Sequence, residues 1–138
     1  MSVGYLLDTN IISELRKGPR GDSKVKRWHE NLDADGQWIS VLVLGEIRQG
    51  VEKLRAKDPV SSGHLESWLD GLAIGYRDRI LPVTAEIANR WGTLNAGNPV
   101  PYIDGFLCAT ALEHDLTFAT RNVKDVSRTG VSYVNPFE

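Results

Sequence analysis

The chain has 138 residues, of which 41% are hydrophobic and 25% are charged, and its formal net charge is −2. This balance is typical of an ordinary soluble protein, and the length predicts one domain, residues 1–138, with a hydrophobic core of its own. The net charge gives no global basic field of the kind that indicates a nucleic-acid partner, although a local basic patch would suffice for one.

The sequence has no features of a secreted or membrane protein. It starts with neither a basic leader nor a long apolar stretch, so we expect no signal peptide and no membrane span. Cys108 is the only cysteine, which excludes an intrachain disulfide. A reducing, cytoplasmic location is therefore expected.

The first half of the chain predicts two strands, each followed by a helix. The apolar run Tyr5–Leu7 predicts a strand that ends at Asp8, with Thr9 or Asn10 capping the next helix. A second strand is predicted at 38–40. After it, hydrophobic residues recur at helical spacing, so position 46 lies on a helix; they are Leu44, Ile47, Val51 and Leu54.

The second half predicts three more strands between helices. Asp58-Pro59 and Ser61–Gly63 are predicted to break the chain before a helix over 65–72. Thr84 is placed to cap a helix that carries residues 87–91. The remaining predicted elements are strands at 80–83, 116–120 and 131–134, a loop at 98–101 and a helix at 103–114.

Strands that alternate with helices predict an α/β fold, here a single domain with a five-stranded, mostly parallel sheet flanked by helices on both faces. Ligands of such sheets bind beyond the carboxyl ends of the strands. Asp8 follows the first strand and Asn122 follows the fourth. We therefore expect these two side chains to share one rim of the sheet.

Three acidic side chains stand where an acid is unusual. Asp8 ends an apolar run, Glu46 lies within a helical pattern, and Asp104 lies near the start of another helix. Carboxylates at the rim of a core lose hydration, and three of them drawn together repel one another, which a divalent cation relieves. Magnesium prefers oxygen ligands, and manganese can substitute for it. The set predicts a magnesium or manganese site that hydrolyses a phosphate ester.

Each acid taken alone also has a structural explanation. Asp8 can turn a strand into a helix, Glu46 can be a solvated helix residue, and Asp104 can interact with a helix macrodipole. The ordered set of three, each with its neighbours, favours the metal site. No Gly-rich dinucleotide fingerprint, Walker A or zinc-protease motif supports another enzyme class.

Five phrases occur in order along the chain: Leu7–Glu14, Glu46–Val51, Asp104–Ala111, Thr120–Asn122 and Asn135–Phe137. Together they resemble the PIN-domain nucleases, and within them the FitB-like branch of the VapC-type toxins of type II toxin–antitoxin pairs. The resemblance covers 7–137. It implies a PIN fold and a magnesium-dependent endoribonuclease that is inhibited by a cognate antitoxin protein, with a homodimer and a hetero-oligomer as assemblies. The family's catalytic, metal-binding acids correspond to Asp8, Glu46 and Asp104.

The sequence departs from the family pattern at a fourth acidic position, which falls on Asn122 and so brings no charge. Asp125, three residues later, is a candidate substitute. Thr120 is a candidate for ordering the site through its hydroxyl, and Arg121 is placed to contact RNA phosphate. Asp115 stands where relatives often have the glycine that ends a helix, and aspartate tolerates that left-handed turn at a modest cost.

Two other functions stay open at this point. A PIN-like domain that binds RNA or protein without cutting it is favoured by Asn122 and opposed by the three acids, and a metal-dependent phosphatase would act on small phosphate esters instead. A basic cluster soon after Asp8 fits either a solvated face or a phosphate contact. Its members are Arg16, Lys17, Arg20, Lys24, Lys26 and Arg27.

Overall fold

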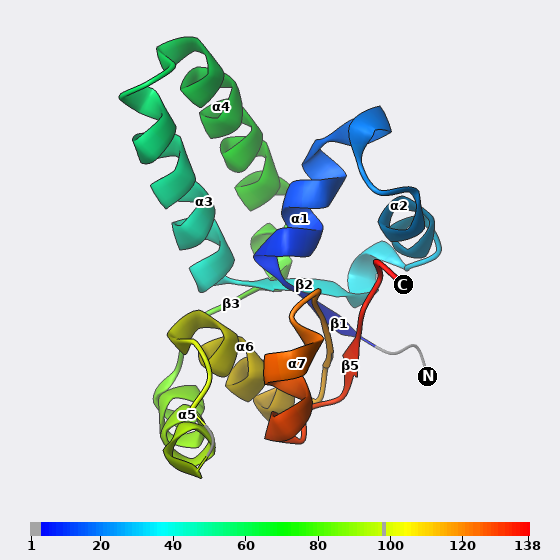
Figure 1. Ribbon diagram of the computed structural model, residues 1–138, viewed down its shortest axis with the longest axis vertical. Coiled ribbons are helices and arrows are strands. Elements are labelled where there is room, and N and C mark those ends of the chain that lie inside the picture. Colours follow the sequence, from blue (N-terminus) through cyan, green and yellow to red (C-terminus); the bar gives the residue numbers. More distant parts are fainter. Residues whose placement is uncertain (1–3, 98) are drawn as a thin grey trace.

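A computed structural model describes residues 4–97 and 99–138 of the chain. Positions 1–3 and Asn98, which belongs to the predicted loop 98–101, lie outside the described residues. Five parallel strands form one sheet in the order β3-β2-β1-β4-β5 (Figure 1). The predicted α/β fold is confirmed, and the pairing is parallel throughout. The strands are β1 (Tyr5–Leu7), β2 (Gln37–Ser40), β3 (Ile80–Leu81), β4 (Thr117–Ala119) and β5 (Tyr133–Val134).

Helices connect the strands and cover both faces of the sheet. The longest are a pair in which α3 leads by a short turn into α4, and this pair projects from one side of the molecule (Figure 1). In the described part of the chain, no helix is both long and apolar enough to cross a membrane. The helices are α1 (Thr9–Arg16), α2 (Ser23–Glu30), α3 (Val41–Arg55), α4 (Pro59–Gly75), α5 (Ala85–Gly97), α6 (Tyr102–Glu113) and α7 (Val123–Val126).

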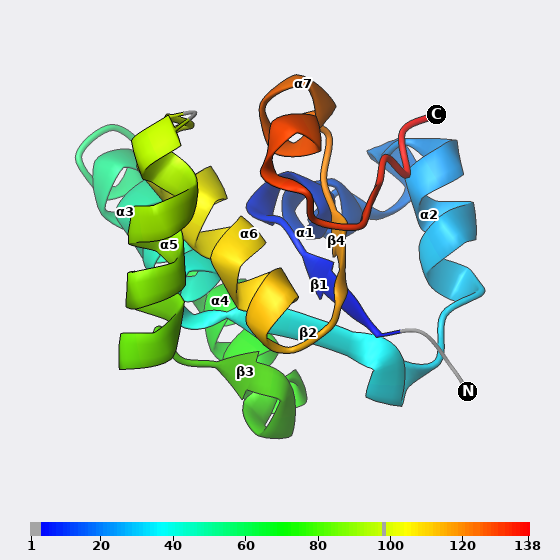
Figure 2. The same cartoon turned by 90° about the horizontal axis from the view of Figure 1, so that it is seen from below.

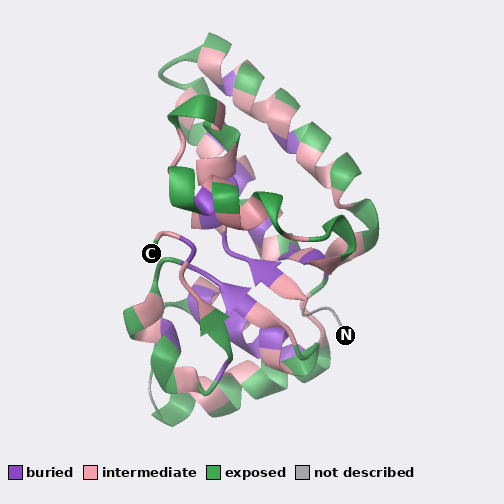
Figure 3. Cartoon of the chain, turned by 90° about the vertical axis from the view of Figure 1, so that its right-hand side faces the viewer, coloured by how far each residue is buried: buried purple, intermediate pink, exposed green. Residues whose placement is uncertain are grey.

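Alternate residues of the strands point to two separate cores. In β1, Leu7 joins a cluster with residues of α1, α2, α3 and α4, whereas Leu6 joins a cluster with residues of α6 and α7. In β4, Ala119 belongs to the same cluster as Leu7, and Phe118 belongs to the same cluster as Leu6. This is the period of two expected of a strand buried on both sides. Figure 3 shows the central strands largely buried, whereas the edge strand β5 is exposed at Tyr133.

The order of the strands places β1 at a change of direction. The chain passes from β1 to β2 and β3 on one side, then returns to β4 and β5 on the other. Because ligands of parallel sheets bind where the strand order reverses, the carboxyl ends of β1 and β4 are the expected binding place. Figure 2 shows these two strands side by side between α1 and α6.

Three local predictions are settled by the structure. The cap of α1 is Asp8 and not Thr9 or Asn10, because its carboxylate accepts a hydrogen bond from the backbone N–H of Thr9. The predicted break at 61–63 is wrong, since α4 starts at Pro59 and Asp58 caps it through the N–H of Ser61. The left-handed conformation of Asp115 is confirmed, with φ 54°.

Candidate active site

Asp8 lies at the centre of the site, at the carboxyl end of β1. Its side chain is buried and accepts hydrogen bonds from the hydroxyl of Thr120 at 2.6 Å and from the side-chain amide of Asn10 at 3.2 Å. The pKa of Asp8 is raised from 3.8 to about 6. Burial is the main cause of the raised pKa, and the charges of Asp104 and Glu46 add to it. The hydrogen bonds from Thr120 and from the N–H of Thr9 oppose it. A cation close to Asp8 would stabilise the ionised form of this buried carboxylate.

Glu46 reaches the site from α3 on one face of the sheet. Ser40 ends β2 and caps α3 through the N–H of Leu42, which places the start of the helix directly after the strand. The hydroxyl of Thr9 donates to Oε1 of Glu46 at 2.6 Å. Thr9 therefore connects two of the acids, because its backbone N–H donates to Asp8 at 2.7 Å.

Asp104 enters from the opposite face, in the first turn of α6. It is buried, and burial raises its pKa, with the charges of Asp125 and Glu46 adding to the effect and a hydrogen bond from Asn122 opposing it. The next residue, Gly105, lets α6 approach α5, because a Cβ at position 105 would lie 2.9 Å from the indole of Trp91. A larger residue there would force the indole of Trp91 or the start of α6 to move.

The loop after β4 contributes neutral donors. The side-chain amide of Asn122 donates to Asp104 at 3.4 Å, and its backbone N–H donates to the hydroxyl of Thr120 at 3.0 Å. Asn122 therefore borders the acids as the sequence predicts. Asp125 lies farther out, at 40% side-chain exposure and 3.9 Å from Arg128, although its charge raises the pKa of Asp104.

Arg121 occupies the rim of the site. Its backbone N–H donates to Oδ1 of Asn10 at 3.3 Å, and its guanidinium lies over the ring of Phe137 at 4.6 Å. Arg121 is exposed. Asn10 bonds both Asp8 and the backbone of Arg121. These two hydrogen bonds connect the start of α1 to the loop after β4. The sequence predicts Asn10 only as a helix cap, since no linear pattern relates it to residue 121.

The three acids fit a divalent cation by their chemistry. Across residues 4–97 and 99–138, no three histidine, cysteine, aspartate or glutamate side chains form a ready-made metal cluster. The carboxylates of Asp8, Glu46 and Asp104 are each engaged by a neutral hydroxyl or amide donor instead. The donor set is all oxygen, as magnesium prefers, and the charges of Asp104 and Glu46 raise the pKa of Asp8. A cation would relieve that repulsion.

Thr120→Val tests how the site is held together. The hydroxyl of Thr120 is fully buried and bonds both Asp8 and the N–H of Asn122. Valine has nearly the same shape but removes one donor from buried Asp8 and the acceptor of the N–H of Asn122, so we expect a loss of about 1–3 kcal/mol in the free energy of unfolding. Chemical denaturation measures it. Thr120→Ser keeps the hydroxyl and should lose much less, and equal losses in the two variants would contradict this role.

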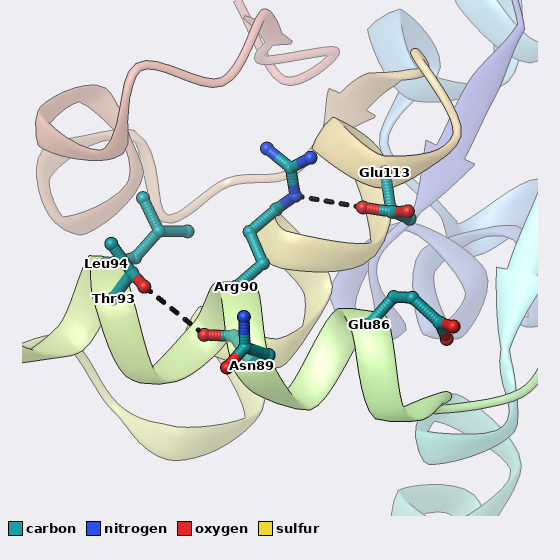
Figure 4. A pocket seen from close by; sticks show the side chains of 6 residues that line it. All are labelled: Glu86, Asn89, Arg90, Thr93, Leu94 and Glu113. Carbon is teal, nitrogen blue, oxygen red and sulfur yellow. Dashed lines mark hydrogen bonds and ion pairs between the residues drawn. The ribbon is translucent and has the colours of Figure 1, made fainter.

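A second pocket lies away from the acids. It is a hollow of about 440 Å³ between α5 and the end of α6 (Figure 4). The guanidinium of Arg90 and the carboxylate of Glu113 pair across it at 3.0 Å. None of the site residues predicted from sequence lines it, so we do not assign it to the candidate site.

Comparison with known proteins identifies the family. The model of the PIN domain matches residues 5–130, which is most of the chain. The chain belongs to the PIN-domain family. The family resemblance predicted from the sequence is thereby confirmed, and the α/β fold described above is the fold of this family.

Several relatives match this PIN domain over nearly its whole length. Toxin FitB of Neisseria gonorrhoeae is 32% identical over 96% of this chain and 97% of that protein. VapC ribonuclease Y4jK of Sinorhizobium fredii is 28% identical over 96% and 97%. The crystal structure of FitAcB from N. gonorrhoeae superposes with a TM-score of 0.89 at 28% identity, covering 97% of this chain and 99% of that one. A toxin–antitoxin complex from Klebsiella pneumoniae gives a TM-score of 0.75 at 27% identity over 98% and 99%.

Proposed function

We propose that this PIN domain is a magnesium-dependent endoribonuclease, and that it acts as the toxin of a type II toxin–antitoxin pair in the cytoplasm. The observation that carries the proposal is that Asp8, Glu46 and Asp104 lie near the carboxyl ends of β1 and β4, where Asp8 and Asp104 are buried and the charges of Asp104 and Glu46 raise the pKa of Asp8. Relatives that match the whole chain are named as a toxin and as a ribonuclease, which supports the choice of RNA as the substrate.

The proposed metal ligands are Asp8, Glu46 and Asp104. A bound magnesium or manganese ion would supply charge neutralisation at the phosphate and a more acidic water. The protein's own part is to hold its carboxylates in place. Thr120 and Asn10 orient Asp8, and Thr9 orients Glu46 through its hydroxyl. We assign to Glu46 the further role of orienting the attacking water.

Asn122 stands where a fourth acid would add a charge, and it favours a second candidate function. In that alternative the chain is a catalytically weak or inactive PIN-like module that binds RNA or protein. The amide of Asn122 donates to Asp104 and supplies no negative ligand there. We nevertheless prefer the nuclease, because the three other acids are all present and two of them are buried.

The proposed partners are an RNA substrate and a cognate antitoxin protein, with a homodimer and a toxin–antitoxin hetero-oligomer as assemblies. The solved structures that resemble this chain include a toxin–antitoxin complex from Klebsiella pneumoniae. That similarity supports an antitoxin as the partner.

Sequencing of RNA ends in cells tests the proposal. Induction of the protein should create new RNA ends at a limited set of positions and stop growth, and both effects should disappear when the proposed antitoxin is expressed together with it. An RNA population without new ends after induction would contradict the nuclease and favour the binding module. Cleavage of small phosphate esters without cleavage of RNA would indicate the phosphatase instead.

A further inference from the structure

A groove of about 290 Å³ opens beside the three acids on the side of α3. Thr9 and Glu46 form its inner end, where it meets the candidate active site. Its outer walls come from α1 and α4, with the apolar side chains of Leu65 and Trp68 on one side. Figure 1 shows α1 lying against the α3–α4 pair at this place. The groove is thus a continuation of the site along the protein surface.

Of the six residues of the basic cluster, only Arg16 and Lys17 line this groove. Lys17 is already paired, since its ammonium lies 3.0 Å from the carboxylate of Glu14. Arg16 forms no ion pair with any acid in the part of the chain that the structure describes. Its guanidinium lies over the indole of Trp68, 5.8 Å from the ring centroid. Arg16 is therefore a positive charge held in the groove and available to an anion.

The charge pattern around the site favours a nucleic-acid backbone as that anion. Glu46 at the inner end and the two other acids of the site repel a polyanion, so RNA needs cations near the cleaved bond to remain bound. Arg16 supplies one such cation on the side of the groove. The apolar wall formed by Leu65 and Trp68 suits the sugar and base of a single-stranded nucleotide better than it suits a free anion.

We propose that this groove is a nucleotide subsite for single-stranded RNA, in which Arg16 binds a phosphate next to the cleaved bond and Trp68 holds Arg16 in place. The proposal rests on the nuclease function proposed above and assigns a substrate contact outside the three acids. A guanidinium suits this task because it presents several donors in a fixed plane to phosphate oxygens. An acidic protein segment would use the same chemistry, and the test separates the two.

Arg16→Gln tests the proposal, with Arg20→Gln as the matched control. Arg20 belongs to the same basic cluster and is exposed, but it does not line the groove. Both changes are made in the Asp104→Asn background, so that RNA is bound and not cut, and binding of a short, labelled single-stranded RNA is followed by fluorescence anisotropy at several salt concentrations. We expect Arg16→Gln to weaken binding about tenfold and to reduce the slope of log K against log salt by about 0.7. Arg20→Gln should leave both values close to those of the background protein.

A second readout uses the protein with its acids intact. There Arg16→Gln should raise KM for RNA while kcat stays near that of the unchanged protein, because a contact of this kind acts on binding and not on the bond that breaks. Equal RNA affinities for Arg16→Gln and Arg20→Gln would overturn the subsite. If Arg16→Gln weakened binding of a partner protein and left the RNA affinity unchanged, the subsite would also be overturned. The groove would then be a binding site for that protein. If the unchanged protein neither cuts nor binds RNA, the proposed function fails, whereas normal cutting with no effect of Arg16→Gln removes the subsite alone.

Discussion

Asp104→Asn is expected to lower the rate of RNA cleavage by at least about a hundredfold while the protein stays folded. The change keeps the size of the side chain and removes one charged ligand, and even residues that merely support metal ligands cost up to about a hundredfold when replaced. Asp104 is buried and its pKa is raised, so loss of its charge should not destabilise the protein without metal. Cleavage of a labelled RNA and thermal melting of the same preparation measure the two effects.

The control for this prediction is Asp125→Asn. Asp125 acts on Asp104 through its charge but has 40% side-chain exposure and lies near Arg128. We expect Asp125→Asn to keep most of the cleavage rate. An equal loss in both variants would make Asp125 the missing fourth acid, and an unfolded Asp104→Asn protein would mean that Asp104 serves the structure.

The second large effect concerns Asp8 and pH. Its pKa is raised from 3.8 to about 6, so the folded state holds the proton more tightly than the unfolded state. The stabilisation from protonated Asp8 is therefore complete at or below pH 3.8 and is lost as the pH rises through about 6. The difference between the two pKa values corresponds to about 3 kcal/mol. Denaturant unfolding of the metal-free protein across this range measures it.

Asp8→Asn isolates this contribution from other groups that titrate in the same range. Glu14, Glu52, Asp58 and Glu66 have lowered pKa values and give slopes of the opposite sign. Because asparagine does not titrate, the stability of the variant relative to the parent should rise by about 3 kcal/mol between about pH 3 and pH 7. A constant difference between the two proteins would mean that Asp8 ionises as it does in an unfolded chain. RNA cleavage should be lost in this variant as well.

Much of the fold follows from sequence patterns that are local. The strands are predicted by apolar runs such as Tyr5–Leu7, and the helices by apolar stripes such as the one around Glu46. A sheet that is buried on both faces needs such strands, together with helices that have one apolar face. The break predicted at 61–63 failed for a physical reason. Serine and glycine are tolerated inside a helix when neighbours pack against it, and here Ser62 is buried.

The acids of the candidate site could be selected from the sequence, but the residues that hold them could not. Thr9 and Asn10 looked like helix caps, yet they bond Glu46 and the loop after β4. Such contacts depend on how α1 meets α3 and β4 in space, which no linear spacing encodes. The same is true of Arg16, whose position over Trp68 arises from the packing of α1 against α4.

The most direct test of the account is whether manganese stabilises the folded protein through the three acids. A ligand that binds only the folded state at a hundredfold excess over its Kd adds about 2.7 kcal/mol. For a chain of this length that raises Tm by about 10 °C. We predict this rise for the parent in manganese relative to EDTA, and a much smaller one for Asp104→Asn. A melting curve of the parent that does not change between manganese and EDTA would contradict the assignment of Asp8, Glu46 and Asp104 as metal ligands.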